Sequence, residues 1–190
     1  VFLMSEVAGR STIIEKIQKI DPTITKSSPK VQELVSKMKE LEFQGYQFEG
    51  ADGSFELLAR KVIGRYKPFF KLHYYQTSGI NPRVEEGVCA CAKIKLEVEN
   101  QIEVTAGEGD GPVNALDIAL RKALSRFYPA VNQIRLTDYK VRVLDGKSAT
   151  ASKVRVLIES SDGKNTWTTV GVSCDVMEAS WLALCDSFEY

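Results

Sequence analysis

The C-terminal two-thirds of the chain repeats one succession of strands and a helix, which limits the possible folds more than any other feature. Residues 67–128 hold three segments with strand character and then an amphipathic helix, and the pattern returns over about 131–190. A fixed spacing of this kind predicts two copies of one supersecondary unit. Residues 92–98 alternate polar and apolar side chains, which indicates a strand with one face on a core. We expect Ile94 in this strand to superpose on Val154 in the second copy.

The first 66 residues have a helical character instead. Thr12 begins a capping-box pattern, and a second helix is expected between residues 28 and 45, with a proline in its first turn and a glycine at its end. Asp52 or Ser54 is expected to cap a third helix. The sequence thus predicts an α+β chain: a small helical subdomain over residues 1–66, then a domain over residues 67–190 made of two βββα units.

Composition excludes several classes of protein. Lys and Arg together number 25, as do Asp and Glu, so no basic excess favours nucleic acid or an anionic membrane. The apolar start ends after four residues, and no apolar run is long enough for a membrane span or a signal peptide. The cysteines contain no C-x-x-C pair, so we expect reduced thiols in a cytoplasmic protein without a metal site. They are Cys89, Cys91, Cys174 and Cys185.

Catalytic patterns are lacking in the sequence. His73 is the single histidine and has no acidic or histidine partner at a suitable spacing, so a surface position is expected for it. No Ser-His-Asp order and no G-x-S-x-G elbow occurs. An enzyme contained wholly within these residues is therefore not expected.

Residues 107–112 are a glycine-rich segment that leads into a helix, and two interpretations of it stay open. The glycines let the backbone approach a small ligand, and the amides of the first helical turn can hold a carboxylate. Alternatively, the segment only caps the helix. Asp138 could meet an ammonium group, while Tyr139 could wall an apolar side chain. Together these features suit a zwitterion with a short aliphatic tail.

Several motifs resemble one family of enzymes over essentially the whole chain. They are Gly109-Asp110-Gly111-Pro112-Val113-Asn114-Ala115, Leu136-Thr137-Asp138-Tyr139, Thr169-Val170-Gly171-Val172-Ser173, Glu178-Ala179-Ser180-Trp181 and the opening Ser5-Glu6-Val7-Ala8-Gly9-Arg10-Ser11-Thr12-Ile13. The chain resembles the linker subdomain and C-terminal regulatory domain of α-isopropylmalate and citramalate synthases. Details such as Trp167-Thr168-Thr169-Val170 are more similar to the citramalate branch.

The resemblance implies an allosteric domain that forms a homodimer and binds the end-product amino acid, isoleucine in the citramalate branch and leucine in the other. The catalytic (β/α)8 barrel, with its divalent metal and acetyl-CoA, lies outside these residues, so neither cofactor is expected here. Matched motifs, with Asp138 added from the argument above, place the effector against Asp110, Gly111, Val113, Asn114, Leu136, Asp138, Tyr139, Val143, Ala149, Ala151, Val172 and Cys174.

Two alternatives remain beside the isoleucine sensor and its leucine-binding variant. The domain could be a dimerisation scaffold with a vestigial ligand site. The helical subdomain could also contribute residues to the active site of a neighbouring barrel, with Arg10 and Ser11 as candidates.

Overall fold

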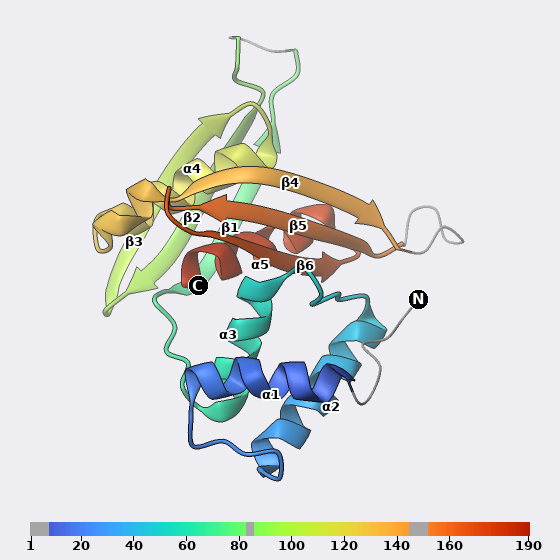
Figure 1. Ribbon diagram of the computed structural model, residues 1–190. Coiled ribbons are helices and arrows are strands. Elements are labelled where there is room, and N and C mark those ends of the chain that lie inside the picture. The colour runs from blue at the N-terminus through green and yellow to red at the C-terminus, as the bar shows by residue number, and fades with distance from the viewer. Residues whose placement is uncertain (1–7, 83–85, 145–151) are drawn as a thin grey trace.

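The computed structural model describes residues 8–82, 86–144 and 152–190, which form helices and two antiparallel sheets (Figure 1). The helices are α1 (Ala8–Ile20), α2 (Pro29–Gln44), α3 (Asp52–Ile63), α4 (Pro112–Ser125), the 3-10 helix η1 (Pro129–Gln133) and α5 (Val176–Glu189). The strands are β1 (Lys71–Gly79), β2 (Ala90–Val98), β3 (Gln101–Gly109), β4 (Arg135–Val143), β5 (Val154–Ser161) and β6 (Thr166–Ser173). The sheet orders β1-β2-β3 and β4-β5-β6 confirm the duplicated βββα arrangement.

Strand register fixes the period of the duplication at 64 residues. Tyr75 of β1 pairs with Ile94 of β2, and Tyr139 of β4 pairs with Ile158 of β5. The two helices α4 and α5 begin and end the same 64 positions apart. Ile94 therefore corresponds to Ile158, and the expected superposition on Val154 is wrong. Both strands alternate, so a shift by an even number of residues preserves the pattern that the prediction used.

Helices α4 and α5 lie between the two sheets and share one core with them (Figure 1). Each unit repeats the same polar contact between its third strand and its helix. Thr105 Oγ1 donates to the carbonyl of Ala119 at 2.6 Å, and Thr169 Oγ1 donates to the carbonyl of Ala183 at 2.7 Å. The hydroxyl of each threonine is thereby satisfied inside the core.

The glycine-rich segment before α4 is a strand rather than a loop. Gly107 and Gly109 belong to β3, and both are buried against α4. A Cβ on Gly107 would lie 2.7 Å from the carbonyl oxygen of Ala115 and 2.8 Å from the amide of Ala119. These glycines therefore permit close packing of helix on strand, and only Gly111, at the N-cap of α4, keeps the expected position at a helix start.

Helices α1 to α3 form a second group beside the β4-β5-β6 sheet, where α3 contacts β6 and α5 (Figure 1). Val170 and the partly buried Leu157 face this side and belong to the helical core. Helix α2 ends at Gly45 with φ 114°, as expected from the sequence. The expected caps of the other two helices are wrong. α1 begins at Ala8, so Thr12 lies inside it.

Asp52 and Ser54 connect α3 to the second unit instead of capping the helix. Asp52 Oδ1 accepts a hydrogen bond from the amide of Thr168 at 3.1 Å. Ser54 Oγ accepts from the amide of Val170 at 2.9 Å and donates to Asp186 Oδ2 at 2.7 Å. The long-range partners of these two side chains explain why a local capping pattern misassigned them.

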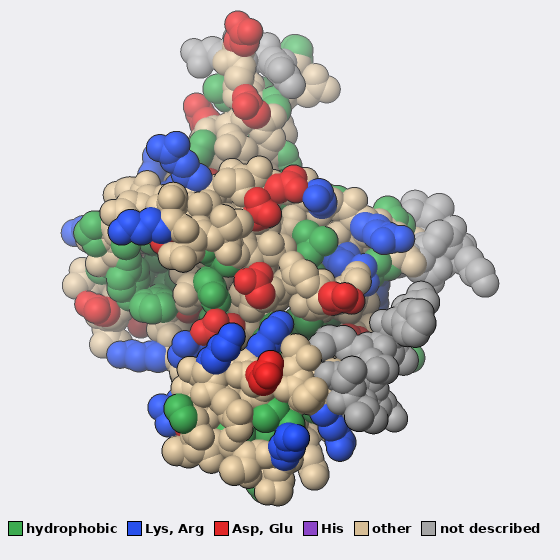
Figure 2. All heavy atoms as spheres, in the orientation of Figure 1, with side chains coloured by type: hydrophobic (Ala, Val, Ile, Leu, Met, Phe, Trp, Pro, Cys, Tyr) green, Lys and Arg blue, Asp and Glu red, His purple; other side chains and the backbone are tan. Residues whose placement is uncertain are grey.

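Charges of both signs are interspersed over the face shown in Figure 2, in keeping with the equal numbers of acidic and basic residues. His73 Nε2 lies 3.0 Å from Glu97 Oε2 on the outer face of the first sheet. The four cysteines are free thiols. Across the described ranges, no helix has the length and apolar character to cross a membrane.

Candidate functional site

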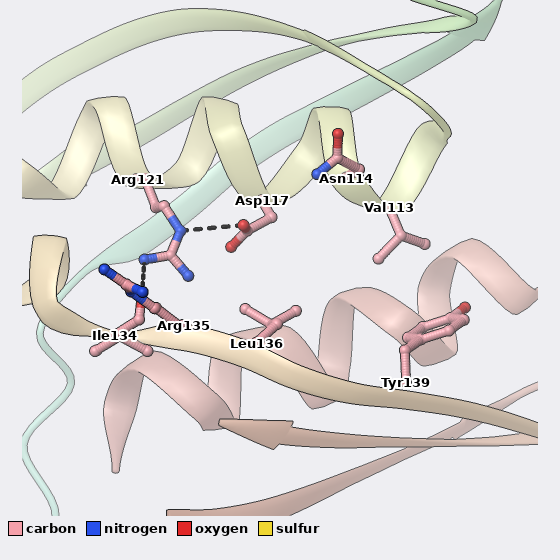
Figure 3. A pocket seen from close by; sticks show the side chains of 8 residues that line it. All are labelled: Val113, Asn114, Asp117, Arg121, Ile134, Arg135, Leu136 and Tyr139. Carbon is pink, nitrogen blue, oxygen red and sulfur yellow. Dashed lines mark hydrogen bonds and ion pairs between the residues drawn. The ribbon is translucent and has the colours of Figure 1, made fainter. Parts of the chain in front are cut away.

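An open pocket of about 580 Å³ lies between α4 and β4, where the first unit meets the second. Its volume falls in the range typical of small-molecule sites, about 300–1,000 Å³. Figure 3 shows Val113, Asp117 and Arg121 on the helix directed across it toward Leu136 and Tyr139 on the strand. The lining residues are Val113, Asn114, Asp117, Arg121, Ile134, Arg135, Leu136 and Tyr139.

One wall of the pocket is apolar and rigid. Leu136 and Tyr139 lie on the same face of β4, because a bulge between Leu136 and Asp138 shifts the alternation by one residue. The hydroxyls of Tyr139 and Ser180 lie 2.8 Å apart, and Ser180 Oγ donates to the carbonyl of Val176 at 2.6 Å. Since that bond uses the hydroxyl hydrogen of Ser180, Tyr139 is the donor between the two. This bond to α5 holds the Tyr139 ring in place beside the pocket.

The opposite wall carries an ion pair on successive turns of α4. Arg121 Nε lies 3.0 Å from Asp117 Oδ2, and the side chains are only 21% and 13% exposed. Arg121 Nη1 also donates to the carbonyl oxygens of Val131, at 3.0 Å, and of Ile134. The guanidinium carbon lies 5.0 Å from the centre of the Phe188 ring. Arg121 is therefore fixed by four neighbours around one end of the pocket.

Asp117 keeps one oxygen without a partner. Its Oδ1 is buried and accepts no hydrogen bond from any described residue. Burial raises the pKa of this carboxyl group, and the hydrogen bond and charge of Arg121 counteract part of the rise. The pocket thus contains a desolvated carboxylate with unused acceptor capacity.

The corresponding place between α5 and β1 is filled by side chains. Sixty-four positions after Asp117 stands Trp181, which is 6% exposed and packs against Tyr75, the counterpart of Tyr139, with ring centres 5.2 Å apart. Cys185, partly buried in the same core, stands in the place of Arg121. An indole ring therefore closes the space between α5 and β1, whereas the space between α4 and β4 stays open and is lined by a charged pair.

A family model named the LeuA allosteric (dimerisation) domain matches residues 49–190, about three-quarters of the chain. The chain belongs to this family. An (R)-citramalate synthase of Aquifex aeolicus is 46% identical over 187 residues, which are 98% of this chain and 35% of that protein. The (R)-citramalate synthase of Geobacter sulfurreducens is 45% identical over 188 residues, 99% of this chain and 36% of that protein.

A 2-isopropylmalate synthase of Aquifex aeolicus is a more distant relative. It is 25% identical over 188 residues, which are 97% of this chain and 33% of that protein. The chain spans about a third of the length of these relatives.

In this LeuA-type domain the pocket gathers four of the residues that the motifs indicated. They are Val113, Asn114, Leu136 and Tyr139. Asp110 and Gly111 precede α4 and do not line the pocket, while Val143 lies farther along β4 and is 60% exposed. Cys174 is exposed after β6. Ala149 and Ala151 lie outside the described residues.

Asp138 and Val172 lie on faces directed away from the pocket. Asp138 pairs in register with Glu159, and its Oδ2 lies 2.9 Å from Lys140 Nζ. Val172 faces the end of α2, because a Cβ on Gly45 would lie 3.3 Å from Val172 Cγ1. The structure therefore does not bring these two residues to the space between α4 and β4.

Four lining residues escaped the sequence analysis: Asp117, Arg121, Ile134 and Arg135. Asp117 and Arg121 are four positions apart on a helix, a spacing that is common in surface ion pairs. An alignment of the two units at the period of 64 residues would have matched Asp117 with Trp181. A carboxylate in one unit at the position of a buried, large apolar residue in the other is the signal that could have indicated the site.

Proposed function

We propose that this domain senses a branched-chain amino acid, isoleucine before leucine, and thereby inhibits a citramalate-synthase-like enzyme of which it is part. The observation that carries the proposal is the open pocket between α4 and β4 at the place that Trp181 fills in the other unit. The catalytic step, acyl transfer from acetyl-CoA to a 2-oxo acid, belongs to a barrel outside these residues. The domain itself contributes regulation and no chemistry.

The lining of the pocket supports an amino acid with a small aliphatic side chain. Val113, Leu136 and Tyr139 offer apolar surface, while Asp117 and Arg135 offer charges of opposite sign for the two ends of a zwitterion. The preference for isoleucine follows from relatives at 45–46% identity that are named citramalate synthases. Discrimination among isoleucine, leucine and valine rests on single methyl groups, each worth about 1–3 kcal/mol in a fitted pocket.

Calorimetric titration of the chain with isoleucine, leucine and valine tests this proposal. We expect saturable binding of isoleucine. Leucine and valine should each bind at least roughly tenfold more weakly than isoleucine. Tyr139→Ala should weaken isoleucine binding by at least about tenfold, because the ring forms one wall. Tyr74→Ala is the matched control, since this ring lies on the outer face of the first sheet. Absence of binding by all three amino acids at millimolar concentration would contradict the proposal and favour a scaffold with a vestigial site.

We further propose that the domain forms a homodimer through the exposed apolar row of β4. Tyr139, Val141 and Val143 share the face of β4 that is directed toward the helix layer, yet they are 39%, 45% and 60% exposed. Apolar side chains in a contiguous row are typical of a surface that a partner covers. A second copy placed there would also cover the pocket mouth beside Tyr139.

Sedimentation of the wild-type chain and of two variants tests the dimer. Val143→Asp places a charge in the proposed contact and should shift the chain to a monomer, because burying an unpaired charge is costly. Ile102→Asp is the matched control, since Ile102 is 55% exposed on another sheet and should leave the dimer intact. A monomeric wild-type chain, or a dimer that survives Val143→Asp, would contradict the assignment.

A further inference from the structure

We propose that Asp117 is the residue that binds the ammonium group of the ligand, so that the pocket selects primary amines over neutral molecules of the same shape. The inference rests on the proposed function and adds the polar recognition that the motif comparison did not assign. It gives Asp117 the role that the sequence suggested for Asp138. Arg121 acts as a positioning residue that orients the carboxylate.

The unused oxygen of Asp117 carries the argument. An ionised carboxylate accepts hydrogen bonds at both oxygens and donates none. Oδ2 has Arg121 at 3.0 Å, whereas Oδ1 is buried without a partner in the described structure. A buried acceptor left unsatisfied costs about 1–3 kcal/mol. Figure 3 shows this carboxylate directed toward the space between α4 and β4, where a rotation of the side chain would bring Oδ1 to a ligand. A hydrogen bond from the ligand to this oxygen would remove the cost.

Asp117 is the charged residue of the pocket that can bind an ammonium group, because the other charged lining residues are cations. Among the eight lining residues it is the single acid, and Arg121 and Arg135 are the cations. Arg121 is already held by the carbonyl oxygens of Val131 and Ile134 and by the Phe188 ring. The exposed Arg135 stands at the Arg121 end of the pocket (Figure 3), where it can meet a ligand carboxylate.

Asp138 is excluded from this role by the fold. Its carboxylate lies 2.9 Å from Lys140 Nζ, on the opposite face of β4 from Tyr139. An ammonium group lying against Leu136 and Tyr139 would therefore be on the other side of the strand from Asp138.

The comparison of the two units supports the same assignment. Trp181 and Cys185 occupy the positions of Asp117 and Arg121 in α5, where the space is closed. The charged pair thus occurs in the unit that has the pocket and is replaced by apolar groups in the unit that lacks it. A charge retained beside an opening, rather than inside a packed core, is more typical of recognition than of stability.

A cycle of one protein change and one ligand change isolates this contact. We propose to measure the affinities of wild-type chain and Asp117→Asn for isoleucine and for the analogue in which hydrogen replaces the amino group. Asp117→Asn keeps the shape and removes the charge, so isoleucine binding should fall by roughly 10- to 100-fold, as expected for one charge-assisted bond. The analogue should bind both proteins equally. Asp138→Asn, the matched control, should change neither affinity.

Each outcome decides between specific claims. Equal losses for both ligands would mean that Asp117→Asn disturbs the fold, and undiminished isoleucine binding would mean that another group holds the amine; either result overturns the role of Asp117. The wild-type chain alone gives a second test, since isoleucine should bind at least about tenfold more tightly than the analogue. If the wild-type chain binds isoleucine and the analogue equally, only this inference fails. If it binds neither, the proposed function fails.

Discussion

Gly171→Ala is expected to lower the free energy of unfolding by about 3 kcal/mol or more, the upper end of what overpacking costs in a well-packed core. Gly171 lies in β6 under α5, and an added Cβ would overlap the carbonyl oxygen of Ala179 and lie 2.9 Å from the amide of Ala183. Both neighbours are helix backbone, which cannot move aside as a side chain can. Urea denaturation followed by circular dichroism measures the loss.

Gly79→Ala is the matched control for this change. Gly79 is also a strand residue, and nothing lies within 4 Å of the position of an added Cβ. We expect its free energy of unfolding to stay within about 0.5 kcal/mol of wild type, as for most surface changes. If Gly171→Ala were no more destabilising than Gly79→Ala, the close packing of α5 on β6 would be wrong.

Trp181→Ala is the second change with a large expected effect. It should cost about 3–5 kcal/mol, because it removes a buried indole ring and leaves a cavity between α5 and β1. Trp181 is 6% exposed and contacts Tyr75 across this space. The loss of its tryptophan fluorescence and the shift of the thermal unfolding midpoint both report on the change.

An exposed aromatic residue provides the comparison for Trp181. Tyr74 is 37% exposed, and its contact with Lys93 Nζ, 5.7 Å from the ring centre, is worth about 0.5–1 kcal/mol at such a site. Tyr74→Ala should therefore destabilise far less than Trp181→Ala. Similar losses for the two variants would show that Trp181 does not fill the space between α5 and β1. The pocket assignment depends on the difference between that filled space and the open one between α4 and β4.

The fold class could be predicted because it depends on local patterns. Alternation in the strands and helical periodicity in α4 and α5 are set by which face is buried, and both are visible in the sequence. Gly45, which takes φ 114° at the end of α2, was predictable for the same reason, since few other residues adopt that conformation.

The period of the repeat was not predictable from alternation alone. Strands shifted by an even number of residues present the same faces, so Ile94 matched Val154 as well as Ile158. The pairing of each strand with its neighbour distinguishes these two registers. The helices α4 and α5, read together with the strands, would have given the correct spacing of 64 residues.

On the β4 side of the pocket, Leu136 and Tyr139 line the space as predicted, and a bulge explains why Asp138 does not. In a regular strand Leu136 and Asp138 would share a face. The bulge at Thr137 puts Leu136 and Tyr139 on the inner face and Asp138 on the outer one. A bulge depends on pairing with the neighbouring strand, which the sequence of one strand does not reveal.

The helix side of the pocket depends on tertiary contacts. Asp117 can be identified as a candidate binding residue only when its burial, its unpaired Oδ1 and its correspondence with Trp181 are known. Gly107 shows the converse case, because its sequence context suggested contact with a ligand, while the structure assigns it to the packing of β3 on α4.

A crystal structure of the chain grown with isoleucine tests the central claim most directly. We expect the amino acid between α4 and β4, with its side chain against Leu136 and Tyr139 and its amino group within hydrogen-bond distance of Asp117 Oδ1. Isoleucine bound elsewhere, such as the groove lined by Phe69, Tyr128 and Trp167, would contradict the account. So would a pocket between α4 and β4 filled by side chains of the protein itself.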